Sequence, residues 1–358
     1  MNISEKAKGI IDSCRFCWMC RHICPIGNAT GLERNTARAR ALGASMVVRG
    51  ATELKEISKN VYECALCGAC TNNCMTGWDP KVFIQELKTE IVLNGVAPDY
   101  IVGLIEKYSE TGNIYGKKAC SCLDSLYGKG GKIGLFVGQD ALYNVPELVK
   151  KVVELLNKAG VKVDLLKNQD SGAALWFLTG KTEETKNAAV ACANALNEYE
   201  TVIVYDPQDY KLMKHEYNEW NVEVKAEIVS INEYLLKLIK DGALKVKKGN
   251  NEYTLQDNYF YVRDLDDETT AREIIASVGV NKEMLLKGKE TNMAGHLIMN
   301  EYMPEVIKEV AQNRWINAKN MDCNVIVTES PAEYVLLKAT APQGAKVLSV
   351  EEMLLENI

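Results

Sequence analysis

"CRFCWMCRHICP", Cys14–Pro25, and "CALCGACTNNCM", Cys64–Met75, are the two stretches that decide the fold of this chain. Each repeats the spacing Cys-x2-Cys-x2-Cys-x3-Cys, and together they hold most of the 12 cysteines. The cysteines of the first row are Cys14, Cys17, Cys20 and Cys24, and those of the second row are Cys64, Cys67, Cys70 and Cys74. Two matching rows of thiols call for one chemical explanation.

The spacing is typical of bacterial ferredoxins. In these proteins the first three thiolates of a row hold one [4Fe–4S] cluster, and the fourth binds the other cluster when two rows are present. We therefore expect two [4Fe–4S] clusters. The class of motif, rather than the spacing alone, assigns Cys14, Cys17, Cys20 and Cys74 to cluster one, and Cys64, Cys67, Cys70 and Cys24 to cluster two.

Zinc and disulfides explain the rows less well. Structural zinc takes two separate pairs of cysteines, so a third cysteine three residues further on is surplus. Disulfides are unusual where thiols stay reduced. Pro25 follows the first row as in ferredoxins, whereas Met75 stands where a second proline is usual. This departure changes the loop and leaves the number of thiolates intact.

Length and charge limit the possible functions. The chain has 358 residues, which suits two or three domains, and a net charge of −6, which argues against a nucleic-acid partner. No apolar run approaches the roughly 18 residues that span a bilayer, and the N-terminus has no signal pattern. We expect a cytoplasmic protein without direct membrane insertion, although association with a membrane through a partner stays open.

The segments around the rows have helical patterns. Residues 35–63 have helix-forming composition, with apolar residues near a 3.6 period at Leu42, Met46, Leu54 and Ile57. Residues 79–95 read as an amphipathic helix that ends at Asn94-Gly95. Rows separated by helices indicate an α-helical ferredoxin domain over residues 1–98, followed by a helical linker over 99–131. Trp18, inside the first row, is expected to pack around a cluster.

From Lys132 onward, strand and helix patterns alternate, which indicates helices covering a parallel sheet. "VIVYDPQDYKLMK" from Val202 aligns with "VIVTESPAEYVLLK" from Val325, with one residue inserted. We expect a duplicated α/β domain, with copies at residues 132–243 and 244–358. Residues 251–262 are the first strand candidate of the second copy. Asp209 and Glu333 become equivalent, at the strand end where such sheets bind ligands.

Over nearly its full length, the chain resembles iron–sulfur oxidoreductase subunits that join a helical ferredoxin domain to two cysteine-rich "CCG" domains. Such subunits occur in heterodisulfide reductase, anaerobic glycerol-3-phosphate dehydrogenase, glycolate oxidase and lactate-utilisation enzymes. The resemblance rests on both cysteine rows, on "YECALCGACTNNC", on "TGNIYG" from Thr111 and on "KIGLFVG" from Lys132. It is specific in the ferredoxin part and looser beyond it.

The departure from this family lies in the CCG domains, whose thiolates hold an unusual iron–sulfur centre in catalytic members. Every family cysteine that can be aligned there is replaced. The aligned positions are Asp170–Gly172, Asp209, Tyr259, Met293–Gly295 and Ser330–Glu333. Because these side chains replace soft thiolates poorly, we expect the α/β part to have lost that centre. Asp209 and Glu333 could instead mark a new site, although acidic residues at helix starts are ordinary caps.

The four remaining cysteines have weaker signals. Cys120 and Cys122 lie in the linker and could bind metal, alone or in a third centre with Cys192 or Cys323. Two unremarkable thiols are the better interpretation. Cys192, in a helical segment, and Cys323, before a strand, are expected to be packed core residues.

The leading hypothesis is an electron-transfer subunit of an oxidoreductase complex that is not catalytic on its own. The resemblance implies a hetero-oligomer in anaerobic metabolism, with an FAD-containing dehydrogenase subunit and a further carrier such as a ferredoxin or an electron-transfer flavoprotein. One alternative is a catalytic subunit of the heterodisulfide reductase type with an altered metal site in the α/β half. Another is an assembly or docking subunit with structural clusters.

Overall fold

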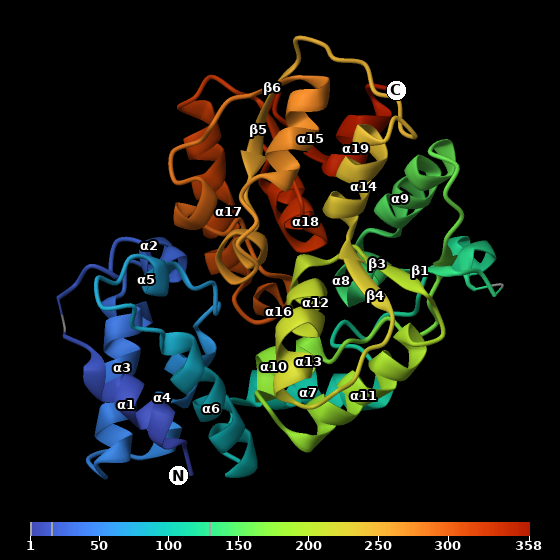
Figure 1. Cartoon of the computed structure of the whole chain (residues 1–358). Helices are drawn as coiled ribbons and strands as arrows, with labels where there is room; N and C mark the ends of the chain where they lie inside the picture. Colours follow the sequence, from blue (N-terminus) through green and yellow to red (C-terminus); the bar gives the residue numbers. More distant parts are fainter. Residues whose placement is uncertain (1, 16, 129) are drawn as a thin grey trace.

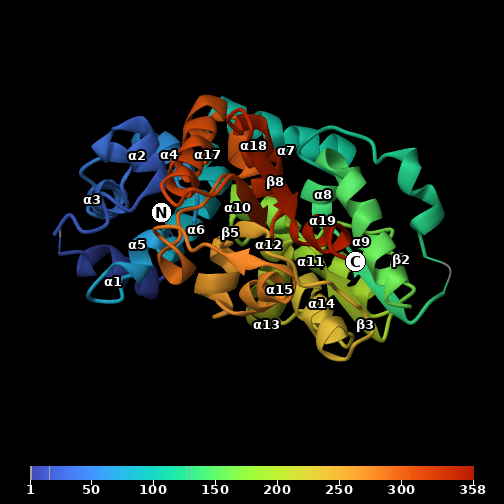
Figure 2. The same cartoon turned by 90° about the horizontal axis from the view of Figure 1, so that it is seen from above.

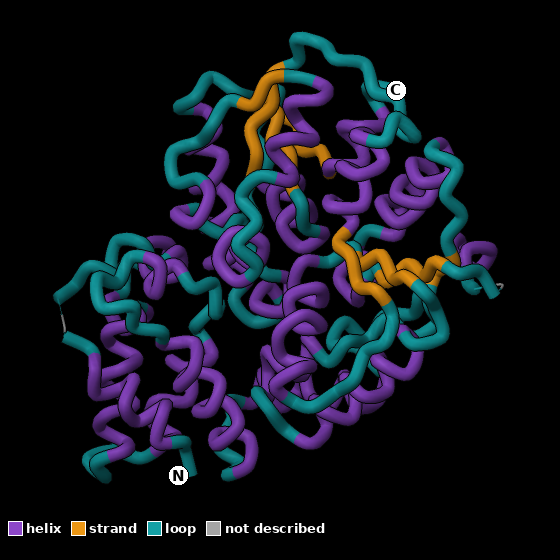
Figure 3. Tube along the Cα trace, viewed as in Figure 1, coloured by secondary structure: helices purple, strands orange, loops and turns teal. Residues whose placement is uncertain are grey.

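The computed structural model describes residues 2–15, 17–128 and 130–358. Figures 1 and 2 show a lobe of helices from the N-terminal part beside a larger part that contains the strands. Figure 3 shows the strands as two small groups surrounded by helices. The protein is therefore mostly helical, with two small parallel sheets in its C-terminal part.

Six α-helices and one short 3-10 helix of the N-terminal lobe surround the cysteine rows. They are α1 (Glu5–Ser13), α2 (Pro25–Thr30), η1 (Glu33–Asn35), α3 (Ala37–Val48), α4 (Leu54–Tyr62), α5 (Ala69–Asn72) and α6 (Pro80–Leu93). Side-chain caps begin several of them: Thr36 accepts from the N–H of Ala39, and Asp79 accepts from that of Lys81. α6 ends at Leu93 and is capped by Asn94, which is followed by Gly95 with φ of 65°, so the helix stops where the sequence predicts.

The apolar pattern of residues 35–63 is only partly used for the core. The segment forms two helices, α3 and α4, and Gly50 between them has φ of 70°. Small alanines form the buried side of α3. Leu42 and Met46 are 48% and 41% exposed, so this part of the apolar pattern does not face the core. They lie on the outer side of the lobe.

The two sheets have the same strand order. The first sheet runs β2-β1-β3-β4 and the second β6-β5-β7-β8, and every pairing is parallel. The strands of the first sheet are β1 (Ile133–Phe136), β2 (Asp164–Leu165), β3 (Thr201–Val204) and β4 (Glu227–Ser230). Those of the second sheet are β5 (Glu252–Gln256), β6 (Val280–Asn281), β7 (Val325–Thr328) and β8 (Lys346–Ser349).

Helices follow the strands, as the alternation predicts. After α7 (Asp99–Thr111) and η2 (Ser121–Leu126), the helices of the first half are α8 (Gly138–Asn144), α9 (Pro146–Lys158), α10 (Ala173–Thr179), α11 (Glu183–Leu196), α12 (Pro207–Lys211), η3 (Leu212–Glu216), α13 (Tyr217–Glu219) and α14 (Ile231–Lys240). Those of the second half are η4 (Phe260–Asp264), α15 (Thr270–Val278), η5 (Gly288–Glu290), α16 (Leu297–Asn300), α17 (Pro304–Lys319), α18 (Pro331–Thr340) and α19 (Val350–Leu355).

The strand expected over residues 251–262 is too long. β5 ends at Gln256, and the rest of the segment turns into η4, which is a π-helix. The side chain of Asn258 accepts from the N–H of Phe260, a local bond that turns the backbone out of the extended conformation. This turn matters for the cysteine rows, because η4 contacts the second row.

The N-terminal lobe shares an apolar core with the α/β part. Phe83 and Leu87 of α6 belong to the same buried cluster as Phe177 of α10. The hydroxyl of Tyr62 donates to the carbonyl of Leu178 at 2.9 Å, across the boundary between the two parts. The lobe is thus packed firmly against the rest of the chain, and the cysteine rows have fixed neighbours from both parts.

Candidate iron–sulfur centre

The first cysteine row is a loop between α1 and α2. Cys14 directly follows α1, and Cys24 precedes Pro25, the first residue of α2. The N–H of Gly27 donates to the sulfur of Cys24 at 3.4 Å, so this cysteine caps the helix. Trp18 has φ of 72°, a left-handed conformation that is rare for bulky residues. Helices therefore fix both ends of the row, with a strained turn between them.

The second row lies between α4 and α6 and includes the short helix α5. Cys64 precedes this helix, Cys70 is part of it, and Cys74 follows it. Leu66 and Gly68 have φ of 55° and 72°, which are left-handed conformations. They turn the chain sharply between successive cysteines, and Gly68 does so at no steric cost.

The fold brings one cysteine of the second row to three of the first. A single cavity is lined by Cys14, Cys17, Cys20 and Cys74. The rest of its wall is formed by Arg15, Trp18, Met19, Arg38, Met75, Thr76 and Trp78. These four cysteines are the ones that the sequence assigns to cluster one.

The other four cysteines influence one another electrostatically. Burial raises the pKa of Cys70 well above its ordinary value, and the thiols of Cys67, Cys64, Cys24 and, more weakly, Cys20 raise it further. Burial also raises the pKa of Cys67, with smaller contributions from Cys24 and Cys64. Cys24 of the first row is therefore close to the first three thiols of the second row. The effect of Cys20 indicates that the two groups of thiols are adjacent.

The donor set fits iron–sulfur clusters. Thiolates are the ligands that iron–sulfur cubes take, and seven of these eight cysteines are partly buried while Cys17 is exposed. Thiolates packed together repel one another, and bound iron offsets that charge. Across residues 2–15, 17–128 and 130–358, no three His, Cys, Asp or Glu side chains converge as one metal ion requires. A four-iron cube binds its thiolates at separate corners and needs no such convergence.

Arg40 of α3 is buried and hydrogen-bonds the backbone next to both rows. It is 3% exposed, and its guanidinium donates to the carbonyls of Asn35, Asn60 and Glu63 at 2.7, 2.9 and 2.8 Å. The sulfur of Cys24 also hydrogen-bonds the carbonyl of Asn35, at 3.2 Å. Arg40 thereby ties the segment after the first row to the residues that lead into the second.

Lys88 of α6 is a buried cation beside the second row. Its Nζ donates to the carbonyl of Phe177 at 2.7 Å and lies 3.8 Å from the centroid of the Phe177 ring. Burial lowers the pKa of Lys88 to about 7, against the opposing effect of the Cys64 thiol. Lys88 is not among the site residues that the sequence predicts. Its position between Ile84 and Ile91, on the apolar side of α6, was the available signal.

The second α/β half also contacts the second row. Arg263 of η4 donates to the carbonyl of Cys67 at 2.6 Å and to that of Lys289 at 2.8 Å, and also to that of Thr291. The next residue, Asp264, pairs with Lys81 at 2.5 Å. Both contacts join the lobe to residues far along the chain, and no pattern in the sequence predicts them.

Asp209, Tyr259 and Ser330, three of the residues expected at the positions of CCG cysteines, line cavities between the two α/β halves. Two small adjoining cavities, of about 20 and 10 Å³, each have room for one water-sized group. The first is lined by Asp170, Ser171 and Asp209 of the first half, and the second by Tyr259, Gly295 and Ser330 of the second half. Asp140 and Asp206 line both. The walls of both cavities thus carry oxygen donors rather than thiols.

Burial governs the chemistry of these carboxyl groups. It raises the pKa of Asp206 and of Asp209, and the neighbouring carboxylates raise both further. Asp209 accepts from the hydroxyl of Ser171. His296 lines the second cavity, is 3% exposed, and has no hydrogen-bond partner for either ring nitrogen among the described residues. His296 is not among the site residues that the sequence predicts. It directly follows Met293–Gly295, the segment expected at the position of a Cys-Cys-Gly element.

Glu333 and Asp209 do not form a common site. Each lies in the first turn of a helix after a strand, as expected. Glu333, however, accepts from the N–H of Ala294 at 2.8 Å and from the amides of Asn258 and Gln256, both at 3.2 Å. Its hydrogen bonds are satisfied within the second half, and it lines neither cavity.

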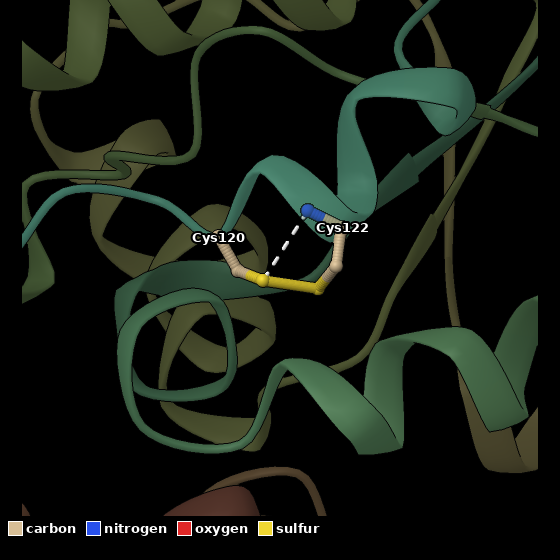
Figure 4. Close-up of a disulfide and its surroundings, with 2 residues drawn as sticks. All are labelled: Cys120 and Cys122. Atoms are coloured by element: carbon tan, nitrogen blue, oxygen red, sulfur yellow. Dashed lines mark hydrogen bonds between the residues drawn. A yellow bond between two sulfur atoms is a disulfide. The ribbon is translucent and has the colours of Figure 1, made fainter.

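The remaining cysteines do not assemble a further centre. Cys120 and Cys122 form a disulfide, shown in Figure 4, so the interpretation as two unremarkable linker thiols is wrong. The sulfur of Cys120 also accepts from the N–H of Cys122 at 3.3 Å. Cys192 in α11 and Cys323 before β7 are buried core residues, as predicted.

Among the described residues, no helix is long and apolar enough to cross a membrane. Residues 10–78 match the family model of the 4Fe-4S dicluster domain. The chain is therefore an iron–sulfur protein whose N-terminal lobe carries a domain of this class.

Comparison with known proteins relates the chain to reductase subunits. One subunit of the fumarate reductase (CoM/CoB) of Methanothermobacter marburgensis is 22% identical, over 98% of this chain and 72% of that protein. One subunit of the dihydromethanophenazine:CoB–CoM heterodisulfide reductase of Methanosarcina mazei is 24% identical, over 68% of this chain and 66% of that protein. The protein is an iron–sulfur protein related to these subunits.

One solved structure has a similar fold. The crystal structure of a hypothetical protein from Helicobacter pylori superposes with a TM-score of 0.60 and 14% identity, over 99% of this chain and 73% of that one. At this identity the likeness concerns the fold alone.

Proposed function

We propose that this protein is an electron-transfer subunit that relays single electrons through two [4Fe–4S] clusters. The observation that carries the proposal is the cavity that joins Cys74 to Cys14, Cys17 and Cys20, with the other four cysteines next to it. Adjacent clusters permit an electron to pass from one to the other. No atom is transferred in this step; one cluster is oxidised and the other is reduced.

The crossed assignment of ligands is part of this proposal. Cluster one takes Cys14, Cys17, Cys20 and Cys74, and cluster two takes Cys64, Cys67, Cys70 and Cys24. The shared cavity supports the first set, and the mutual effects of the thiols on their pKa values support the second. The reduction potentials of the two clusters depend on burial, charge and hydrogen bonds to sulfur. Lys88 and Arg263 place charge near cluster two and would influence its potential.

The partners are proposed from the relatives and the family resemblance. Both relatives are named as subunits of reductases, which supports a hetero-oligomer. An FAD-containing dehydrogenase subunit would deliver or receive electrons at one end of the relay, and a ferredoxin or an electron-transfer flavoprotein at the other. This scheme matches a chain that offers two cluster sites and no iron–sulfur ligands at the aligned CCG positions.

The domain division is proposed as well. A ferredoxin domain over residues 1–98, a linker over 99–131 and two halves over 132–243 and 244–358 fit the positions of the two sheets. The shared strand order supports an origin of the halves by duplication. The α/β part would then act as a scaffold that positions the ferredoxin domain.

A second candidate is a catalytic subunit with an altered site in the α/β half. The observation that favours it is the pair of cavities with Asp140, Asp206, Asp209 and the unpartnered His296. Under this hypothesis, the purified chain itself reduces a substrate, and Asp209→Ala abolishes that activity. A docking subunit with structural clusters would instead keep its clusters oxidised at all accessible potentials.

The first experiment is an iron and acid-labile sulfide count on anaerobically purified protein, with a redox titration followed by EPR. The relay predicts about eight irons per chain and two reducible four-iron signals. About four irons, or clusters that resist reduction, would contradict it. Clearly more than eight irons, with a third signal, would move the chemistry to the α/β half.

A further inference from the structure

A group of apolar side chains is exposed beside the cavity of cluster one. Met75 is 85% exposed, Trp18 is 43% exposed and Met19 is 40% exposed, and all three line the cavity wall. Large apolar residues that gather at the surface over a functional centre mark contact sites for other molecules. Trp18 thus both packs around the cluster site, as expected, and presents its ring to solvent.

The ring of Trp18 is held in place by arginines. The guanidinium carbon of Arg38 lies 3.7 Å from the ring centroid, and that of Arg21 lies 5.6 Å away. The backbone of Trp18 is left-handed, with φ of 72°, and such a conformation persists where the surroundings impose it. The side chain is therefore a rigid, exposed anchor, the type of residue that dominates binding energy in protein interfaces.

The exposed apolar surface continues along α3. Arg38, Leu42 and Met46 are spaced by four residues and so share one side of the helix, over a length of about 12 Å. Leu42 and Met46 are 48% and 41% exposed. In Figures 1 and 2, α3 lies on the side of the lobe that faces away from the α/β part. We call this surface the cluster-one face: Trp18, Met19, Leu42, Met46 and Met75.

The charge around the cluster-one face is positive. Residues 13–52 contain six arginines, of which Arg40 is buried, while Arg34, Arg38 and Arg49 pair with Glu63, Glu33 and Asp12. Residues 1–98 have 12 Lys and Arg against 9 Asp and Glu, whereas the whole chain has 42 against 48. Arg15 and Arg21 are exposed, and the described part of the chain offers neither of them an ion-pair partner. The positive rim therefore stands out on an acidic protein.

We propose that the cluster-one face docks a small electron-carrier protein with an acidic surface. This inference rests on the proposed relay function and names the kind of partner that cluster one serves. Complementary charge speeds encounter and fixes the orientation of a partner, while apolar contacts at the centre of an interface exclude water. Docking here brings the redox group of the carrier next to cluster one, and a single electron then passes between them.

The test follows electron transfer from the dithionite-reduced holoprotein, freed of excess reductant, to oxidised haem carriers in a stopped-flow apparatus. Cytochrome b5 is the acidic probe and cytochrome c is the basic control. In each reaction one electron leaves a reduced cluster and reduces the haem iron from ferric to ferrous. We expect the rate with cytochrome b5 to fall steeply as salt rises, because screening weakens attraction between exposed charges.

Charge and apolar variants then locate the docking surface. Arg21→Glu is expected to lower the rate with cytochrome b5 about tenfold at low salt and to match wild type at high salt. Met75→Gln and Leu42→Gln are expected to raise the half-saturating carrier concentration several-fold at every salt concentration. Lys181→Glu changes an exposed charge on the α/β part and is the matched control, with no change expected. Iron counts of all variants should match wild type, and the rate of each variant is compared after allowing for the cluster potential measured in that variant.

Several results would overturn the proposal. If Arg21→Glu and Lys181→Glu behave alike, or if the rate with cytochrome b5 does not fall as salt rises, the partner is not acidic or docks elsewhere. Arg15→Glu takes the place of Arg21→Glu should the latter lose iron. Self-association of wild type in sedimentation, abolished by Arg21→Glu, would assign the face to a second copy of the chain. Reduced clusters that pass electrons to neither haem would contradict the relay itself.

Discussion

Cys24 and Cys74 are the residues on which the arrangement of the two clusters depends. In the crossed arrangement, Cys74→Ser damages cluster one and Cys24→Ser damages cluster two, since a serine oxygen is a poor ligand for an iron–sulfur cluster. Cys17→Ser and Cys67→Ser provide reference spectra, because those cysteines bind clusters one and two in either arrangement. The EPR spectrum and iron count of Cys74→Ser should therefore match those of Cys17→Ser. A match between Cys74→Ser and Cys67→Ser would refute the crossing.

At the residue scale, the sequence predicts the residues whose chemical role requires a fixed spacing along the chain. Eight cysteines at ferredoxin spacing could be assigned a cofactor before any fold was known. Lys88 and His296 could not, because their importance comes from burial, which depends on packing between distant segments. The same limit explains Leu42 and Met46: their spacing indicates a helical face but does not reveal whether another element covers it.

At the element scale, the π-helix η4 fastens the second cysteine row to the α/β part. We expect Arg263→Ala to destabilise the protein by about 2–3 kcal/mol, because its guanidinium donates to three carbonyls that the variant leaves unsatisfied. It should also shift the potential of cluster two, since the charge of Arg263 lies close to the Cys67 thiol. Urea unfolding and an EPR redox titration measure the two effects.

Two further variants separate the causes. Arg263→Lys keeps the charge but not the planar fork, so it should recover the potential of cluster two more fully than the stability. Lys289→Ala removes an exposed ion pair with Asp266 and should leave the stability nearly unchanged. Equal stabilities of wild type and Arg263→Ala would show that η4 does not hold the lobe.

The alternation of strands and helices predicted both parallel sheets but not η4. Residues 251–262 are rich in aromatic residues that favour strands, but β5 ends at Gln256 and a local bond between Asn258 and Phe260 turns the chain there. Such bonds compete with sheet pairing and leave no periodic trace in a sequence. The ends of elements were therefore the weakest part of the prediction, and here an element end contacts the cysteine rows.

At the scale of the whole molecule, the two α/β halves are joined through polar contacts as well as an apolar core. The hydroxyl of Tyr205 in the first half donates to the carboxyl of Glu351 in the second at 2.5 Å, and Lys151 pairs with Glu352 at 2.8 Å. Leu135 and Ile203 of the first sheet share a core cluster with Leu255 and Ile326 of the second. The repeat in the sequence predicts two sheets, but nothing in it predicts how they face each other.

Glu351 gives this junction a pH dependence. Burial raises its pKa to about 7, so the folded protein keeps this proton at pH values where the unfolded chain has lost it. The stability linked to Glu351 is complete below its ordinary pKa of 4.5 and is lost as the pH rises towards 7. Glu351→Gln stays neutral at every pH and can still accept from Tyr205. We expect the stability advantage of Glu351→Gln over wild type to be larger at pH 8.5 than at pH 6, by about 1–2 kcal/mol.

Urea unfolding of the holoprotein at the two pH values measures this gain. Glu356→Gln is the control, because Glu356 lies in an exposed pair with Lys346 and its replacement should change stability by a similar small amount at both pH values. A gain that is the same at pH 6 and pH 8.5 would mean that Glu351 is already ionised in the fold. In that case the contact with Tyr205 would hold the halves together as a charged hydrogen bond, and alkaline conditions would not loosen the junction.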